Sequence, residues 1–463
     1  MTRILIFLLL CCKAALAAME SSNTSDQAAL VSFRSVISDD PLGALASWRN
    51  QSLHHCQWAG VSCSNRQHPQ RVTSLILDSL MLTGTLSPSL ANLTFLQTII
   101  LSNNYISGIV PPEFGGLLRL QTLILSNNSL SGEIPPNITS CVSLQNLSLD
   151  TNMLIGEIPA ELGKLVNLVR LRLYANKLTG VIPASIVNIT SLVSLDLSEN
   201  SLQGEIPDTI DKLANLGFLQ LSINSLSGKL SSTLFNFSFA YYIDVGMNQL
   251  YGEVPWNMGT NLPRMRRLYL YSNQLEGSIP KWLSNVSRLE RLGLEENQFK
   301  GVVPAELGML PNLSWLALGN NQLVAQTTSD WAFLDALTNC SNLQILELSD
   351  NLFKGLLPSS IANLSTQMQW LSMENNQIAG SIPEEMGRYI NLTVLLMHNN
   401  LVTGSIPSSI GRLQSLHRLS LSGNKFSGEI PSSLGNLTQL NELSLGGNGF
   451  EGSIPGVWVT LRI

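Results

Sequence analysis

Apolar and polar residues alternate along most of this chain in one recurring pattern. In residues 191–207, SLVSLDLSENSLQGEIP, leucines stand at 192, 195, 197 and 202, asparagine at 200, and glycine, isoleucine and proline at 204, 206 and 207. Alternation sends Leu195 and Leu197 to one side of a short strand and Ser194, Asp196 and Ser198 to the other. The pattern therefore predicts one β-strand in each unit, with one buried side.

The asparagine of this pattern recurs mostly at 24-residue steps and defines the repeat. It occupies Asn104, Asn128, Asn152, Asn176, Asn200, Asn224, Asn248, Asn273, Asn297, Asn321, Asn351, Asn376, Asn400, Asn424 and Asn448, and Leu80 holds the position in a degenerate first unit. These residues are called the ladder positions below. We expect each ladder asparagine to be buried and hydrogen-bonded to backbone, because a buried amide without partners costs about 1–3 kcal/mol.

The pattern L-x-x-L-x-L-x-x-N-x-L is that of a leucine-rich repeat. It predicts an α/β leucine-rich-repeat solenoid of about 16 repeats of 24 residues, because each coil must bury its apolar side against its neighbours. Long crossovers make the strands parallel, in a sheet on the concave face. The steps of 25, 30 and 25 residues, from 248 to 273, 321 to 351 and 351 to 376, predict bulges or short insertions in connecting loops.

Composition and charge limit the partners. The chain has 463 residues, 44% of them hydrophobic and 13% charged, enough to bury one large elongated core. A net charge of −6 argues against a nucleic-acid partner, which would need a basic stripe. Strands spaced about 4.8 Å apart give an arc of roughly 75 Å, which favours binding a peptide or protein over enclosing a small substrate.

The residues show no constellation for catalysis. His54, His55, His68, His398 and His417 lack the spacing of metal ligands, and the signatures of kinases are absent. We therefore predict that the chain is not an enzyme and has no cofactor and no metal site.

The chain is predicted to have three segments. Residues 1–18 resemble a signal peptide, with Arg3, an apolar run and small residues, and the run is too short for the roughly 20 residues of a membrane span. Residues 19–70 are predicted to form an N-terminal cap, in which residues 25–37 form a short helix capped by Ser25 or Asp26. Its apolar side holds Leu30, Phe33 and Val36 or Ile37. Residues 71–463 form the solenoid.

Cysteine spacing predicts one disulfide. Cys56 and Cys63 have the C-x6-C spacing that indicates a disulfide in a secreted chain. Cys141 and Cys340 lie in the same repeat column but eight repeats apart, so we expect them to be free, buried and inert.

The cap segments SDQAALVSF and CQWAGVSC, followed by repeats of the form LxLSxNxLSGxIP, resemble the ectodomains of plant leucine-rich-repeat receptor kinases. The segment TTSDWAFLDALTNCSNL, together with GTNLPRMRRL and NLSTQMQWL, is similar to the subfamily of the flagellin and elongation-factor-Tu pattern receptors and the bacterial-blight resistance kinase. This resemblance implies plant-type repeats and a surface that binds ligand and recruits a co-receptor kinase ectodomain of the same repeat class.

The chain departs from those receptors at its end. They carry more repeats, a second cysteine-paired cap, a transmembrane helix and a kinase, whereas no apolar run of 18 or more residues follows the signal here. We expect either a truncated receptor or a secreted chain partnered at that end.

Fourteen N-x-S/T sequons predict glycosylation in a secreted chain. Repeat consensus alone could generate many of them, but we expect most to be occupied, on the flank or convex side. The set predicted to carry glycans is Asn92, Asn137, Asn188, Asn236, Asn285, Asn363 and Asn436. Asn146, in contrast, lies among concave strand positions, where a glycan would block ligand.

Binding specificity is expected at the outward strand residues two, four and six positions before each ladder residue. Arginines and large aromatic residues gather there, the types that dominate interface energy. The predicted ligand-binding residues are Arg170, Arg172, Tyr174, Phe218, Tyr242, Arg267, Tyr269, Tyr271, Arg291, Trp315 and Trp370. Alternatively, some of them only pack across adjacent strands. Arg170 and Arg172 also resemble paired arginines that clamp a peptide's terminal carboxylate in some receptors of this superfamily.

The resemblance implies the extracellular ligand-recognition domain of a plant immune or peptide receptor, in the secretory pathway and at the cell surface or outside the cell. The alternative is a secreted inhibitor of microbial cell-wall-degrading enzymes, similar to polygalacturonase-inhibiting proteins. A third possibility is an inactive fragment whose exposed end aggregates.

Overall fold

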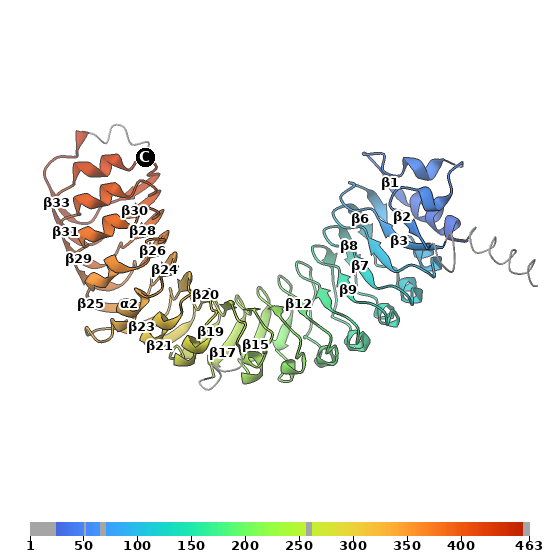
Figure 1. Ribbon diagram of the computed structural model, residues 1–463, viewed down its shortest axis with the longest axis horizontal. Helices are drawn as coiled ribbons and strands as arrows, with labels where there is room; N and C mark the ends of the chain where they lie inside the picture. Colours follow the sequence, from blue (N-terminus) through green and yellow to red (C-terminus); the bar gives the residue numbers. More distant parts are fainter. Residues whose placement is uncertain (1–24, 51, 65–70, 256–261, 457–463) are drawn as a thin grey trace, which may run out of the picture. The chain divides into compact units, whose positions relative to one another are not determined.

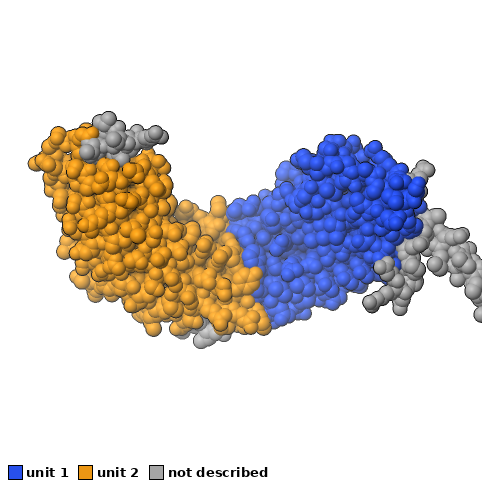
Figure 2. All heavy atoms as spheres, turned by 45° about the horizontal axis from the view of Figure 1, so that its top comes forward, with its two compact units in different colours: residues 1–225 blue, residues 226–463 orange. Residues whose placement is uncertain are grey.

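The computed structural model describes residues 25–50, 52–64, 71–255 and 262–456. The predicted signal peptide, His68 and residues 457–463 lie outside these ranges. The chain divides into two compact units, Met1–Ser225 and Leu226–Ile463 (Figure 2).

In both units each repeat forms one coil, and most coils have the same order of elements (Figure 1). A strand of the principal sheet comes first, a strand of a second sheet follows the ladder residue, and a short helix closes most coils. Leu192, Leu195, Leu197 and Leu202 are fully buried, because the coils stack and cover one another's leucines. The predicted leucine-rich-repeat architecture with parallel strands is confirmed.

Unit 1 contains a principal sheet whose strands pair parallel from β3 onward, with β2 antiparallel to β3. Its strands are β2 (Val61–Cys63), β3 (Val72–Ile76), β5 (Thr98–Ile100), β7 (Thr122–Ile124), β9 (Asn146–Ser148), β11 (Arg170–Arg172), β12 (Ser194–Asp196) and β14 (Phe218–Gln220). The second-sheet strands are β1 (Ile37–Asp39), β4 (Thr83–Thr85), β6 (Tyr105–Gly108), β8 (Ser129–Gly132), β10 (Met153–Leu154) and β13 (Gln203–Glu205).

Unit 2 repeats this arrangement with parallel pairing throughout its principal sheet. That sheet holds β16 (Tyr242–Asp244), β18 (Arg267–Tyr269), β20 (Arg291–Gly293), β22 (Trp315–Ala317), β24 (Ile345–Glu347), β26 (Trp370–Ser372), β28 (Val394–Leu396), β30 (Arg418–Ser420) and β32 (Glu442–Ser444). The second-sheet strands are β15 (Ser225–Lys229), β17 (Gln249–Glu253), β19 (Gln274–Gly277), β21 (Gln298–Val302), β23 (Gln322–Ala325), β25 (Leu352–Leu356), β27 (Gln377–Gly380), β29 (Leu401–Gly404), β31 (Lys425–Glu429) and β33 (Gly449–Glu451).

Short 3-10 helices connect the second-sheet strands to the next principal strand. Most begin directly after a proline, which fixes its own φ and suits the first position of a helical turn. They are η1 (Ala46–Arg49), η2 (His55–Gln57), η3 (Pro88–Asn92), η4 (Pro112–Gly116), η5 (Pro136–Ser140), η6 (Ala160–Lys164), η7 (Ala184–Asn188), η8 (Ile210–Lys212), η9 (Ser232–Phe235), η10 (Lys281–Asn285), η11 (Ala305–Met309), η12 (Ser359–Asn363), η13 (Glu384–Arg388), η14 (Ser408–Arg412) and η15 (Ser432–Asn436).

The ladder asparagines join neighbouring coils through the backbone, as predicted. Asn200 Nδ2 donates to the carbonyl of Leu173 at 3.0 Å in the preceding coil and to that of Leu197 at 3.2 Å in its own. Its Oδ1 accepts the amide proton of Leu178 at 3.0 Å. The predicted burial holds fully for part of the column, for example Asn104 at 5% exposure, whereas Asn200 is half-buried. Gly204 has a φ of +74°, the left-handed conformation that glycine permits.

The N-terminal cap covers the first coil with a helix and a disulfide-linked loop. Residues 25–35 are helical and bury Leu30 and Phe33, but residues 37–39 form β1, antiparallel to β4, instead of continuing the predicted helix. The carboxylate of Asp26 accepts two hydrogen bonds from the guanidinium of Arg71, each 3.0 Å long, and so ties the helix to the first repeat.

The cysteines lie as predicted. Cys56 and Cys63 form a disulfide with a Cα–Cα distance of 5.6 Å. Cys141 and Cys340 are free and buried, and burial raises the pKa of each thiol to about 11. A thiol with so high a pKa is protonated at neutral pH and therefore unreactive.

The longest period break differs from its prediction. The 30-residue step between Asn321 and Asn351 forms an α-helix, α2 (Ala332–Leu337), where a loop insertion was expected. Trp331 and Phe333 are buried and stack at a centroid distance of 5.8 Å, and α2 packs against η11 and η12. The apolar residues of the insertion therefore extend the core. Within the described residues, we find no helix with the length and apolar character needed to span a bilayer.

Candidate ligand-binding face

The principal sheet of each unit has one side on the leucine core, and we call the other side the open face. Its residues lie six, four and two positions before each ladder residue, so they form three rows that run across the strands. Strand register places Tyr242, Arg267, Arg291, Trp315, Ile345 and Trp370 in the first row of unit 2. The eleven predicted binding residues all fall in these rows, four in unit 1 and seven in unit 2.

In unit 1, Arg170 and Arg172 are both exposed on β11. Arg170 Nη1 donates to Asn146 Oδ1 at 3.3 Å across the β9–β11 pair. Asn146 is the sequon residue predicted to interfere with ligand, and it is half-buried on the open face beside this arginine. A glycan at Asn146 would therefore lie next to the arginine pair.

Two carboxylates belong to the strands on either side of β11. Asp196 and Asp150 are 8% and 5% exposed, and Arg172 interacts electrostatically with Asp196. Burial raises the pKa of Asp196, while hydrogen bonds from Ser198 oppose the change. Ser194, Asp196 and Ser198 were predicted to point outward, but all three are buried on the open face, with Ser198 only 1% exposed. These three side chains therefore offer a ligand little accessible surface.

Tyr174 and Phe218 are half-buried and complete the predicted set of unit 1. Burial, followed by the charge of Asp150, raises the pKa of Tyr174, so its phenol stays protonated at neutral pH.

Unit 2 brings three of its predicted tyrosines together. The rings of Tyr242 and Tyr269 are 5.8 Å apart between centroids, and those of Tyr269 and Tyr271 are 6.3 Å apart in an edge-on arrangement. Burial and the charge of Asp244 raise the pKa of Tyr271 to about 12 and also raise the pKa of Tyr242. The contacts show that packing across strands, the alternative to binding, accounts for part of this cluster.

The other predicted residues of unit 2 are less tightly packed. The guanidinium of Arg291 lies over the ring of Trp315, 5.2 Å from its centroid. Arg267 is exposed and lies directly opposite Arg291 on the adjacent strand. Like charges in opposite positions destabilise a sheet unless a partner supplies negative charge. Trp370 is half-buried, and Ile345 separates it from Trp315 in the same row.

Sequence reasoning missed the carboxylates of the second and third rows. Asp244 lies on β16, Glu295 just after β20, Glu347 on β24 and Glu374 just after β26, all on the open face. Burial and neighbouring negative charges raise the pKa of Glu295 to about 7 and also raise that of Glu347. A search for acidic residues in the same columns as the aromatic residues would have found them.

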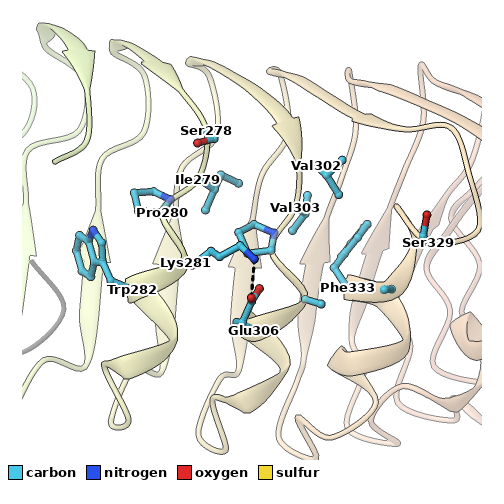
Figure 3. A pocket seen from close by; sticks show the side chains of 13 residues that line it. Ser278, Ile279, Pro280, Lys281, Trp282, Val302, Val303, Glu306, Ser329 and Phe333 are labelled. Carbon is cyan, nitrogen blue, oxygen red and sulfur yellow. Dashed lines mark hydrogen bonds and ion pairs between the residues drawn. The ribbon is translucent and has the colours of Figure 1, made fainter. Parts of the chain in front are cut away.

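The flank of each unit carries a groove between successive 3-10 helices. In unit 2 it has a volume of about 550 Å³ and is lined by Ile279, Val303 and Phe333, with Lys281 Nζ 2.8 Å from Glu306 Oε1 (Figure 3). A groove of about 620 Å³ in unit 1 is lined by Ile134 and Ile158, the same repeat columns. Because the lining recurs with the repeat, these grooves follow from the fold and do not single out a specific site.

Among the residues that the structure describes, one cluster has the residue types of a metal site. Candidate ligand atoms of His54, His55 and Cys56 lie within 4.8 Å of one another. The sulfur of Cys56 is bonded to Cys63, so it cannot act as a thiolate ligand. The cluster is therefore part of the disulfide-linked cap.

The seven residues predicted to carry glycans are all exposed, and they lie in or next to η3, η5, η7, η9, η10, η12 and η15. These helices are outside the principal sheet. Glycans there would leave the open face uncovered.

Family models match most of this chain. A leucine-rich repeat region matches residues 113–333 and a leucine-rich repeat N-terminal domain matches residues 23–64. Single leucine-rich repeats match residues 95–117, 342–364, 391–413 and 415–437.

The similar relatives and solved structures include several plant receptors. The receptor kinase-like protein Xa21 of Oryza sativa subsp. japonica is 49% identical over 63 residues, which are 14% of this chain and 6% of Xa21. The plant peptide hormone receptor RGFR1, solved with RGF2, has a TM-score of 0.70 and 32% identity, over 86% of this chain and 73% of that one. The Arabidopsis receptor kinase HAESA, solved with the peptide hormone IDA and the co-receptor SERK1, has a TM-score of 0.67 and 30% identity, over 94% of this chain and 84% of that one.

Proposed function

The chain belongs to the leucine-rich-repeat proteins and is homologous to the ectodomains of plant leucine-rich-repeat receptor kinases, and we propose that it binds a peptide on the open face of unit 2. Ectodomains of this fold are typically non-catalytic, so recognition is the activity to explain. Two solved relatives hold a peptide hormone, and one of them holds a co-receptor as well.

The observation that carries the proposal is the gathering of Tyr269, Tyr271, Arg291 and Trp315 on three adjacent strands of one sheet face, β18, β20 and β22. A leucine-rich core needs only small polar residues on that face, as Ser420 and Ser444 show further along. Partly exposed aromatic and arginine side chains are the residues that dominate binding energy at interfaces. Their presence in one place therefore indicates a binding surface.

By analogy with the solved complex, the ligand-bound chain recruits a second repeat ectodomain and acts at the cell surface in defence or peptide signalling. The predicted signal peptide and the exposed sequons support an extracellular location. Sedimentation of the chain with and without bound peptide, in the presence of a co-receptor ectodomain, measures that recruitment.

The test of the proposed function uses random twelve-residue peptides displayed on phage and selected on the immobilised chain. The affinity of selected synthetic peptides is then measured for the wild type and for the triple variant Tyr269→Ala, Tyr271→Ala, Trp315→Ala. Loss of about 2 kcal/mol at each of two hot-spot residues, about 4 kcal/mol together, predicts a decrease in affinity of roughly 700-fold.

The matched control is Tyr251→Ala, which removes an equally large side chain from β17 of the second sheet, where it is 45% exposed. The control should retain the affinity of the wild type. Equal affinity of the triple variant and the wild type would refute binding on this face, and inhibition of a fungal pectinase by the purified chain would favour the inhibitor alternative.

A further inference from the structure

From β16 to β26, the open face of unit 2 separates basic from acidic residues by row. The row six positions before the ladder holds Arg267 and Arg291, whereas the rows four and two positions before it hold Asp244, Glu295, Glu347 and Glu374. Two residues along a strand are about 7 Å, so the acidic rows are a distinct band beside the arginine row. A ligand that lies across the strands meets this band as a negative surface.

Two carboxylates of this band have no positive partner within the described part of the chain. The ion pairs found there join other residues, and none involves Glu295 or Glu347. Glu295 Oε2 is shielded from solvent and has no hydrogen-bond partner among the described residues. Glu347 receives one long contact, 3.5 Å, from the Ser349 hydroxyl. Both side chains are half-buried, and shielding a carboxylate oxygen without a partner is costly, so the shielded Oε2 of Glu295 indicates an external partner.

Two glycines leave space in which these carboxylate side chains can lie over the neighbouring strands. A Cβ on Gly319 would lie 2.8 Å from both Glu347 Oε1 and Ser349 Oγ. The carboxylate of Glu347 therefore lies over the segment that follows β22, on the side of β24 that faces β20 and Glu295. A Cβ on Gly293 would lie 2.9 Å from Tyr269 Cδ1 and 3.1 Å from Glu295 Oε2. The bare backbone at both positions lets an aromatic edge and two carboxylates approach one area of the face.

We propose that this area binds an arginine or lysine side chain of the peptide ligand, between the carboxylates of Glu295 and Glu347 and against the ring of Tyr269. The inference rests on the proposed function and adds the chemistry of the ligand. A cation in this position gains charge-assisted hydrogen bonds from the carboxylates and a favourable contact with the aromatic ring. A neutral or acidic side chain would leave both carboxylates unpaired.

The arrangement also fixes the ligand's orientation relative to the rows. The basic side chain meets the acidic band, while Arg267 and Arg291 stand beyond it and suit an acidic side chain or a terminal carboxylate of the same peptide. A peptide with opposite charges about 7 Å apart, the spacing of alternate residues in an extended chain, would satisfy both bands.

The experiment compares the residues selected by three forms of the full chain from a random twelve-residue peptide library on phage. The forms are the wild type, the variant Glu295→Gln with Glu347→Gln, and a control Glu384→Gln with Glu385→Gln, whose two residues lie exposed in η13. Glutamine keeps the shape and removes the charge. We expect arginine and lysine to be enriched by the wild type and the control, and the enrichment to disappear in the first variant.

A second measurement uses one selected peptide and its copy with citrulline or acetyl-lysine in place of the enriched residue. Removing the charge should weaken binding to the wild type at least about 10-fold and leave binding to the Glu295→Gln, Glu347→Gln variant unchanged. A circular-dichroism melt of each variant shows that it is folded.

The outcomes separate the two proposals. Selected peptides without basic enrichment, or with enrichment that persists in the Glu295→Gln, Glu347→Gln variant, overturn the cation site and leave peptide binding intact. Failure of the wild type to select any peptide overturns the proposed function and this inference with it.

Discussion

Replacing Glu295 by glutamine should make unit 2 more stable at pH 8 and change little at pH 4.5. Burial, with contributions from the charges of Glu347, Glu296 and Asp244, raises the pKa of Glu295 from 4.5 to about 7. The folded chain thus holds this proton more tightly than the unfolded chain, and the stability that the protonated form contributes is lost as pH rises from 4.5 to 7. Glutamine carries no charge at either pH, so the Glu295→Gln variant does not lose this stability.

The size of the effect follows from the pKa. A rise from 4.5 to about 7 corresponds to an upper limit of about 3 kcal/mol, since one pKa unit is worth about 1.4 kcal/mol. At about 2 cal/mol/K of unfolding entropy per residue, a 463-residue chain should gain about 3 °C in Tm at pH 8.

Scanning calorimetry of the full chain between pH 4.5 and 8 measures this difference. The curves of Tm against pH for the wild type and Glu295→Gln should diverge as pH rises, whereas Glu384→Gln, changed at an exposed position of η13, should follow the wild type. Parallel curves for the wild type and Glu295→Gln would show that Glu295 is solvated and would refute the reasoning about its burial.

Three further predictions concern the scaffold. Replacing Cys56 and Cys63 by serine should destabilise the cap by about 2–3 kcal/mol in urea unfolding, because the crosslink closes a short loop, and an unchanged midpoint would contradict this. The thiols of Cys141 and Cys340, whose pKa is about 11, should react with a disulfide reagent only after unfolding; rapid labelling of the folded chain would disprove their burial. Asn321→Ala should cost about 3 kcal/mol, since its Nδ2 donates to three carbonyls and its Oδ1 accepts the amide proton of Phe299, and a loss below about 1 kcal/mol would show that the ladder is dispensable.

The sequence predicts the scaffold well because its repeated pattern determines the burial, the hydrogen bonds and the turn conformation of each coil. Leu195 and Leu197 must be buried at alternate positions, Asn200 must satisfy backbone groups of its own and the preceding coil, and Gly204 must adopt a positive φ. Each of these features depends on one residue and on its contacts with the adjacent coils. The period of 24 residues therefore fixes the strand order and register without further information.

The structure at the breaks in the repeat period is harder to predict. The insertion after Asn321 folds into α2 because Trp331 and Phe333 reach Phe353, an aromatic residue in the next coil. Such a contact depends on three-dimensional packing and leaves no local pattern.

The candidate site was predicted only in part for a similar reason. Aromatic and arginine residues in the outward columns are visible in the sequence, but the exposure of a column depends on side chains from neighbouring strands. The alternation of residues along the strand places Asp196 on the open face, but only 8% of it is exposed. On the same face, the Oε2 atom of Glu295 is shielded from solvent. The acidic residues can be found in the sequence columns, but their shielding depends on how the strands pack in space.

Photo-cross-linking of a selected peptide to the full chain tests the central claim most directly. The peptide carries benzoylphenylalanine at one position, and mass spectrometry identifies the residues that become attached. The account predicts attachment on the open face between β18 and β24, at or beside Tyr269, Tyr271 and Trp315. Attachment confined to the flank groove at Ile279 and Phe333, or to the second sheet, would contradict it.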